Sequence, residues 1–133
     1  MAEQSIEIRR ISENEVRINK NILFIEGNIL HLINEGEIDE GVAIAIVEMS
    51  GELSKNTAGK VNVLVDLNKG GKITPKARKM MAAVSSEEKA GKTALFGMNP
   101  VARVLALFFL GITNNKAIRF FKSKEEALHW LKE

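Results

Sequence analysis

Asp66 and two lysines that follow it are the residues whose types and spacing best suggest a binding chemistry. Asp66 lies near the end of the apolar run VNVLVDL, and Lys72 and Lys76 come shortly after it. Thr74 is suited to begin a helix, whose free amides would point the same way. Because open α/β sheets gather ligands at the carboxyl ends of parallel strands, this pattern predicts a site for an anion such as a lipid phosphate. The alternative is an aspartate that ends a strand beside a solvated basic loop.

The stretch PVARVLALFFLGI, residues 100–112, is the second candidate site. It predicts a helix with one apolar face in the core and Arg103 as its single charge. Leu107 and Leu110 fall on the opposite face, where exposure of their apolar side chains to water would be unfavourable. Three alternatives could shield these two leucines from water: another helix of the chain, a second copy in a homodimer, or a membrane surface or lipophilic ligand. In the third, Leu107, Leu110 and Phe108 would enter apolar material while Arg103 met anionic groups.

The chain has few residues suited to catalysis. It contains two histidines, His31 and His129, and no cysteine, and neither histidine has a partner at metal-ligand spacing. Lys72 and Lys92 follow glycines, but neither stretch completes a phosphate-binding loop. The basic residues lack interleaved aromatic side chains for stacking on nucleic acid. We therefore expect no enzyme, no cofactor, no metal site and no nucleic-acid partner.

Length and composition indicate one domain over residues 1–133, of which 45% are hydrophobic. The net charge is +2, with acidic residues in excess before residue 60 and basic residues in excess after it. The absence of cysteine suits a reducing compartment. The start of the chain has no apolar segment typical of a signal peptide, and no apolar run approaches the roughly 20 residues that span a bilayer. We expect a cytoplasmic protein, with peripheral membrane association left open.

The pattern of apolar residues alternates between strands and helices. Residues 1–20 read as a lead-in, with a candidate edge strand at Val16–Ile18, and residues 22–33 predict a hairpin around a Glu-Gly-Asn turn. Asp39 caps the first expected helix, whose stripe at helical spacing leaves Ile44 on the opposite side. Further strands are expected at 61–67, 93–98 and 117–121, and further helices after Thr74, Asn99 and Ser123.

This order, ββαβαβαβα, predicts an α/β fold. Because parallel strands are joined by right-handed crossovers, the strands after the hairpin should run parallel with helices packed on them. We expect a mixed, largely parallel sheet of four to five strands with four helices.

Four stretches resemble the STAS family, and more narrowly the small STAS-like proteins near both anti-sigma-factor antagonists and CRAL-TRIO lipid carriers. They are NILHLINEGEID, VLVDL, ALFGMNPVARVLALFFLGI and FFKSKEEALHWL, and the resemblance runs from about Asn21 to the end. It implies a compact mixed sheet with four helices, and a role in binding or regulation rather than catalysis.

The antagonists of that family are switched by phosphorylation in an Asp-Ser-Ser-Gly motif at the start of the helix after the central strand. Here the corresponding stretch is ITPKA, which lacks the serine, and Thr74 is needed as the helix cap. We therefore expect a non-enzymatic module that binds a regulatory protein or a lipophilic or anionic ligand. The alternative is a homodimer that regulates a protein partner without a small ligand.

Overall fold

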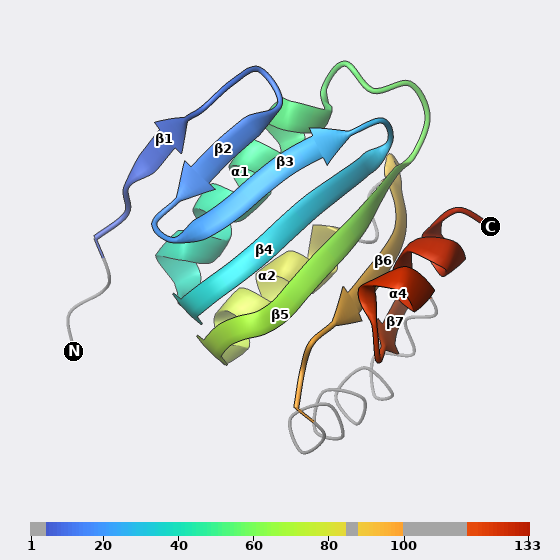
Figure 1. The fold of residues 1–133 in the computed structure, drawn as a ribbon. Coiled ribbons are helices and arrows are strands. Elements are labelled where there is room, and N and C mark those ends of the chain that lie inside the picture. Colours follow the sequence, from blue (N-terminus) through green and yellow to red (C-terminus); the bar gives the residue numbers. More distant parts are fainter. Residues whose placement is uncertain (1–4, 85–87, 100–116) are drawn as a thin grey trace.

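The structure, a computed structural model, describes residues 5–84, 88–99 and 117–133 (Figure 1). Within these ranges seven strands form one sheet and three helices pack on it. The strands are β1 (Ile8–Arg10), β2 (Glu15–Ile18), β3 (Asn21–Glu26), β4 (Ile29–Ile38), β5 (Val61–Ile73), β6 (Ala90–Phe96) and β7 (Ile118–Phe121). The helices are α1 (Glu40–Ser54), α2 (Pro75–Ala83) and α4 (Lys124–Leu131).

The strands lie side by side in chain order, from β1 to β7. The strands β1 to β4 form an antiparallel meander, whereas β4 to β7 run parallel. The α/β class and the mixed sheet are therefore confirmed. The expectation of four to five largely parallel strands was wrong, because the residues before Asn21 add two antiparallel strands.

The candidate strand at Val16–Ile18 is confirmed as β2, although it is not an edge strand. Val16 and Ile18 are fully buried, while the residues between and before them are only partly so. The edge is β1, a strand that the sequence did not suggest because all three of its residues are exposed and two are arginines. A strand with no buried face carries no hydrophobic alternation to detect.

The helices cover the two faces of the sheet unequally. α1 and α2 lie together behind the sheet, and α4 lies in front of β5, β6 and β7 (Figure 1). The larger core cluster joins the sheet to α1 and α2, and a smaller one around Leu64, Phe96 and Leu131 lies under α4. The front of β2, β3 and β4 carries no described helix.

Three helix caps predicted from the sequence are confirmed. Asp39 accepts a hydrogen bond from the amide of Val42, Thr74 from that of Ala77, and Ser123 from that of Glu126. Each bond satisfies a backbone donor that the first turn of a helix leaves without a partner. The helix expected after Asn99 lies outside the described residues.

Two buried asparagines hold the middle of β4 against the turn between β2 and β3. The amide of Asn34 donates to the side-chain oxygen of Asn21 at 2.8 Å, and the amide of Asn21 donates to the carbonyl of Ile18 at 3.1 Å. The backbone amide of Glu35 donates to the same oxygen of Asn21 at 3.1 Å. The register of β4 against β5 shifts between Ile33 and Glu35, so this network lies at an irregularity of the sheet.

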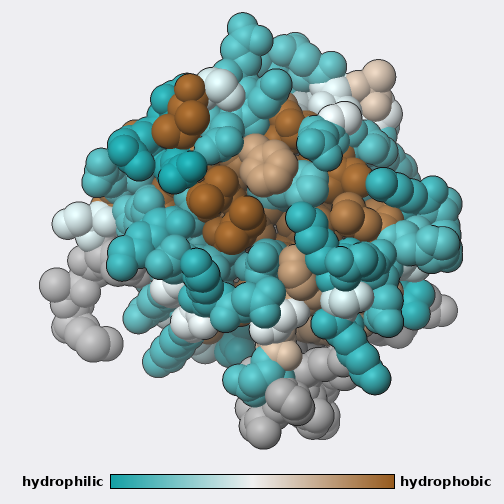
Figure 2. Space-filling model, viewed as in Figure 1, coloured by the Kyte–Doolittle hydropathy of each residue, from teal (hydrophilic) through white to brown (hydrophobic). Residues whose placement is uncertain are grey.

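His31 lies on the front face of the sheet, stacked on Phe24. The two rings are 4.3 Å apart and nearly parallel, at 7°. His31 is only 7% exposed, and its Nε2 atom has no hydrogen-bond partner among the described residues. Burial lowers the pKa of this ring, Glu26 opposes the shift, and Lys124 adds to it. Figure 2 shows this face, on which apolar side chains gather in the middle of a mainly hydrophilic surface.

Replacing Asn21 with alanine should lower the free energy of unfolding by about 2 to 3 kcal/mol, because it leaves buried polar groups of its neighbours without partners. The measurement is urea unfolding followed by circular dichroism. Asn14→Ala, at an exposed position, is the control and should change stability by less than about 0.5 kcal/mol. Equal effects of the two substitutions would contradict the structural role assigned to Asn21.

Acid should destabilise the protein through His31. Since the folded state lowers the pKa of this ring, the unfolded chain binds the proton more readily, and stability falls as the pH drops below about 6.5. Urea unfolding across this range should show the decline in the wild type and a smaller one in His31→Phe. His129→Gln, at an exposed position, should retain the wild-type decline. The same pH dependence in wild type and His31→Phe would refute this assignment.

Candidate ligand-binding cavity

The structure does not bring the residues of the predicted anion site together. The strand β5 continues past Asp66 as far as Ile73, so Asp66 is not at the end of a strand. At roughly 3.3 Å per residue, Lys72 lies about 20 Å farther along. The stretch between them reads as a loop by composition, but it pairs with Glu35 and Gly36 of β4. Pairing with a neighbouring strand therefore overrides the local preference of Asn, Lys and Gly for turns.

Each residue of that predicted site has an ordinary structural role. A side-chain oxygen of Asp66 accepts two hydrogen bonds from Asn68, from its backbone and its side-chain amide, both at 2.9 Å. Thr74 caps α2, and Lys76 lies 4.0 Å from Glu40 in an exposed ion pair. Lys72 is exposed on β5. The second predicted group, Arg103, Leu107, Phe108 and Leu110, lies outside the described residues.

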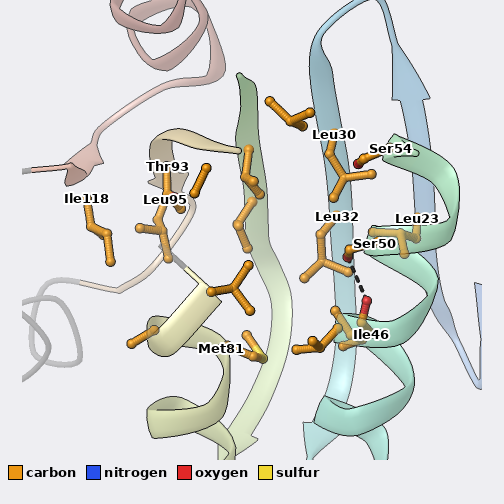
Figure 3. A pocket seen from close by; sticks show the side chains of 18 of the residues that line it. Leu23, Leu30, Leu32, Ile46, Ser50, Ser54, Met81, Thr93, Leu95 and Ile118 are labelled. Carbon is orange, nitrogen blue, oxygen red and sulfur yellow. Dashed lines mark hydrogen bonds between the residues drawn. The ribbon is translucent and has the colours of Figure 1, made fainter. Parts of the chain in front are cut away.

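A cavity of about 510 Å³ lies between the back of the sheet and the two helices α1 and α2 (Figure 3). Leu32 of β4, Val65 of β5 and Leu95 of β6 line its sheet wall, and Met81 of α2 lines a helix wall. Ile118, at the start of β7, lies at the far side from α1. The volume is within the range of about 300 to 1,000 Å³ that is typical of small-molecule sites.

Small side chains on α1 leave this space. Ser50, Gly51 and Ser54 all border the cavity from the helix. The hydroxyl of Ser50 donates to the carbonyl of Ile46 at 2.6 Å, so its polarity is satisfied within the helix. Larger apolar residues at these positions would fill the gap, since protein interiors otherwise pack to high density. The site therefore presents a largely apolar wall with few polar groups.

Three cationic side chains border the cavity, two of them together at one end. Lys55 and Lys89 both line it near the end of α1, and Arg78 lines it from α2. The Lys89 ammonium donates to the backbone carbonyl of Ser54 at 2.7 Å, and Lys55 donates to Glu52 at 2.7 Å. The Lys55 bond lowers the pKa of Glu52. This end could receive the anionic group of a ligand whose apolar part lies deeper.

The sequence did not single out the cavity because its walls come from elements far apart in the chain. One signal was present: Ser50, Gly51 and Ser54 are small residues on one side of an amphipathic helix. On their own they resemble any small-residue stripe against a close neighbour. Only the packing of α1 and α2 over the sheet turns that stripe into the wall of a cavity.

The described residues were compared with the kinds of side-chain cluster that hold metal ions. No group of three His, Asp or Glu side chains lies close enough together in residues 5–84, 88–99 and 117–133 to hold a metal ion. The charged groups that shift the pKa of His31 are Glu26 and Lys124. Asp66 instead accepts hydrogen bonds from Asn68. None of the described helices is both long and apolar enough to span a membrane.

Solved structures of other proteins share this fold. A protein of the DUF3478 family from Shewanella loihica, described as having a SpoIIAA-like fold, aligns with a TM-score of 0.58 at 14% identity and covers 98% of each chain. A proposed anti-sigma factor antagonist from Thermotoga maritima has a TM-score of 0.62 at 16% identity, over 84% of this chain and 93% of that one. The unphosphorylated anti-sigma factor antagonist SpoIIAA has a TM-score of 0.54 at 12% identity, over 96% and 98%.

The expected resemblance to the anti-sigma-factor-antagonist fold is thereby confirmed at the level of fold. No curated protein matches the sequence significantly. The model of a family described as a domain of unknown function, DUF7793, matches residues 23–133, which include β4 to β7 and all the described helices. All the residues that line the cavity lie in the matched range, and the chain belongs to the DUF7793 family.

Proposed function

We propose that this protein is a non-enzymatic regulatory module that binds an anionic amphiphile of the fatty-acid class in the cavity between α1, α2 and the sheet. The observation that carries the proposal is the cavity itself, with its apolar walls and with Lys55 and Lys89 at one end. A long hydrocarbon gains free energy by leaving water for such a wall.

The regulatory part of the proposal is supported by the fold. Two of the structural neighbours are described as anti-sigma factor antagonists, one of them as a proposed antagonist. Such proteins act through binding, so a ligand that fills the space under α1 and α2 would have a direct route to a partner protein. Filling the cavity would favour one arrangement of α1 and α2 over others. A partner protein would then recognise that arrangement.

The ligand's anionic group is assigned to the end near Ser54. Lys89 reaches across from the start of β6 to the end of α1, where the last carbonyls carry partial negative charge. A carboxylate on the side of this ammonium away from the helix carbonyls would take a charge-assisted hydrogen bond from one of its remaining protons. Glu48 also borders the cavity, but it lies about two helical turns away from Lys55.

Leu95→Trp should weaken the binding of radiolabelled palmitate by about tenfold or more, because the larger ring occupies the cavity. Equilibrium binding to the full chain measures the dissociation constant. Ile33→Trp is the matched control, since Ile33 is also half-buried on a strand but faces the front of the sheet. This control should bind palmitate as the wild type does.

The free energy of unfolding of Leu95→Trp distinguishes an open cavity from a space that is already filled by the chain's own side chains. An open cavity should accept the Leu95→Trp ring with little change in the free energy of unfolding. Overpacking of a filled space should cost about 1 to 3 kcal/mol. Absence of palmitate binding to the wild type, together with that loss of stability, would refute the proposed function.

Lys89→Gln should weaken palmitate binding by about two- to fivefold, as expected for a partly exposed charge pair. The same substitution should leave the binding of hexadecanol unchanged, because this alcohol has the same chain without the charge. Lys132→Gln, on an exposed lysine at the end of α4, is the matched control. Equal losses for palmitate and hexadecanol would place the carboxylate elsewhere.

A further inference from the structure

The strand β1 is an exposed sheet edge with apolar side chains. It is the first strand in the sheet order, and β2 is its neighbour on one side (Figure 1). Ile6, Ile8 and Ile11, in and beside this strand, are 39%, 48% and 50% exposed. Proteins usually protect such edges, because unpaired strand backbones and exposed apolar residues invite pairing with another chain.

The hydrogen bonds to β2 show which backbone groups of this segment point outward. The amide of Asn19 donates to the carbonyl of Glu7 at 2.8 Å, and the amide of Ile11 donates to that of Glu15 at 3.0 Å. Glu7 and Ile11 therefore face the neighbouring strands of their own sheet. Because backbone direction alternates along an antiparallel strand, the amides and carbonyls of Ile6, Ile8 and Arg10 face the open edge.

We propose that β1 pairs antiparallel with β1 of a second copy, about a twofold axis at Ile8. In this register Ile8 of one copy forms a hydrogen-bonded pair with Ile8 of the other, and Ile6 with Arg10. Glu7 then lies directly opposite Arg9 of the second copy, twice in the dimer. Opposite charges facing each other across two strands stabilise the pairing.

The charges select this register over its neighbours. Moving the twofold axis by one residue in either direction keeps the outward backbone groups paired. It sets Glu7 against Glu7, or Arg9 against Arg9, and like charges directly opposite each other are destabilising. Within one copy Arg9 already faces Arg17 of β2. A glutamate from the second copy would offset that repulsion.

Apolar side chains continue the contact onto the helix layer. Ile6 packs against the start of α1, since a Cβ atom added at Gly41 would lie 3.4 Å from its Cδ1 atom. Ile44, one turn farther along α1, is 40% exposed. Arg10 reaches Glu52 of the same helix at 4.0 Å, so this side of α1 runs beside β1. Pairing of two β1 strands would shield the isoleucines of both copies from water.

Sedimentation velocity of the full chain over a range of concentrations tests the pairing. We expect a monomer–dimer equilibrium in the wild type, and a dissociation constant about tenfold or more higher in Arg9→Glu. This substitution should leave the fold intact, because Glu at position 9 would face Arg17 within the same copy. The double substitution Glu7→Arg with Arg9→Glu restores the opposite charges and should restore the dimer.

Lys132→Glu, a charge reversal on α4 at the other end of the sheet order, is the control and should dimerise as the wild type does. A wild type that remains monomeric at every concentration overturns the proposal. So does a dimer that Arg9→Glu leaves unchanged, because its interface would then lie on another surface. Failure of the double substitution to restore the dimer also overturns the charge-selected register.

Discussion

The change of direction at β4 is the constraint on which the rest of the structure depends. This strand pairs antiparallel with β3 and parallel with β5, so it joins a meander to a set of crossovers. The buried pair Asn21 and Asn34 lies where its register shifts, and ties the middle of β4 to the turn before β3. Gly70 is needed opposite, because a Cβ atom there would meet the side-chain oxygen of Asn34. Beyond this irregularity β4 continues to Ile38, and the chain then enters α1.

The unequal covering of the two faces follows from that change. The connections β4 to β5 and β5 to β6 progress in one direction across the sheet, and right-handed crossovers then place α1 and α2 on the same face. Of the described helices, α4 alone covers the front, and it leaves His31 and Phe24 to shield each other by stacking. On the back, the small residues of α1 leave the space that forms the cavity.

Local signals predicted much of this fold and little of the candidate site. Caps such as Asp39 and Thr74 depend on a few adjacent residues, so their types suffice to place helix starts. The segment Asn68–Gly71 has the composition of a loop, yet pairing with β4 makes it part of β5. Asp66 therefore lies within the strand, away from the other residues of the predicted anion site. The cavity depends on the distance between elements, which no local pattern records.

The two candidate surfaces differ in their relation to the family. The cavity is lined wholly by residues within the matched range 23–133, whereas β1 and β2 precede that range. Membership of DUF7793 therefore bears on the cavity and says nothing about the edge at β1. The two surfaces also meet different sides of α1: Ser50 and Ser54 border the cavity, while Glu52 contacts Arg10 beside the edge strand. Because one helix forms part of both, a ligand that shifted α1 would also move the residues that flank a second copy.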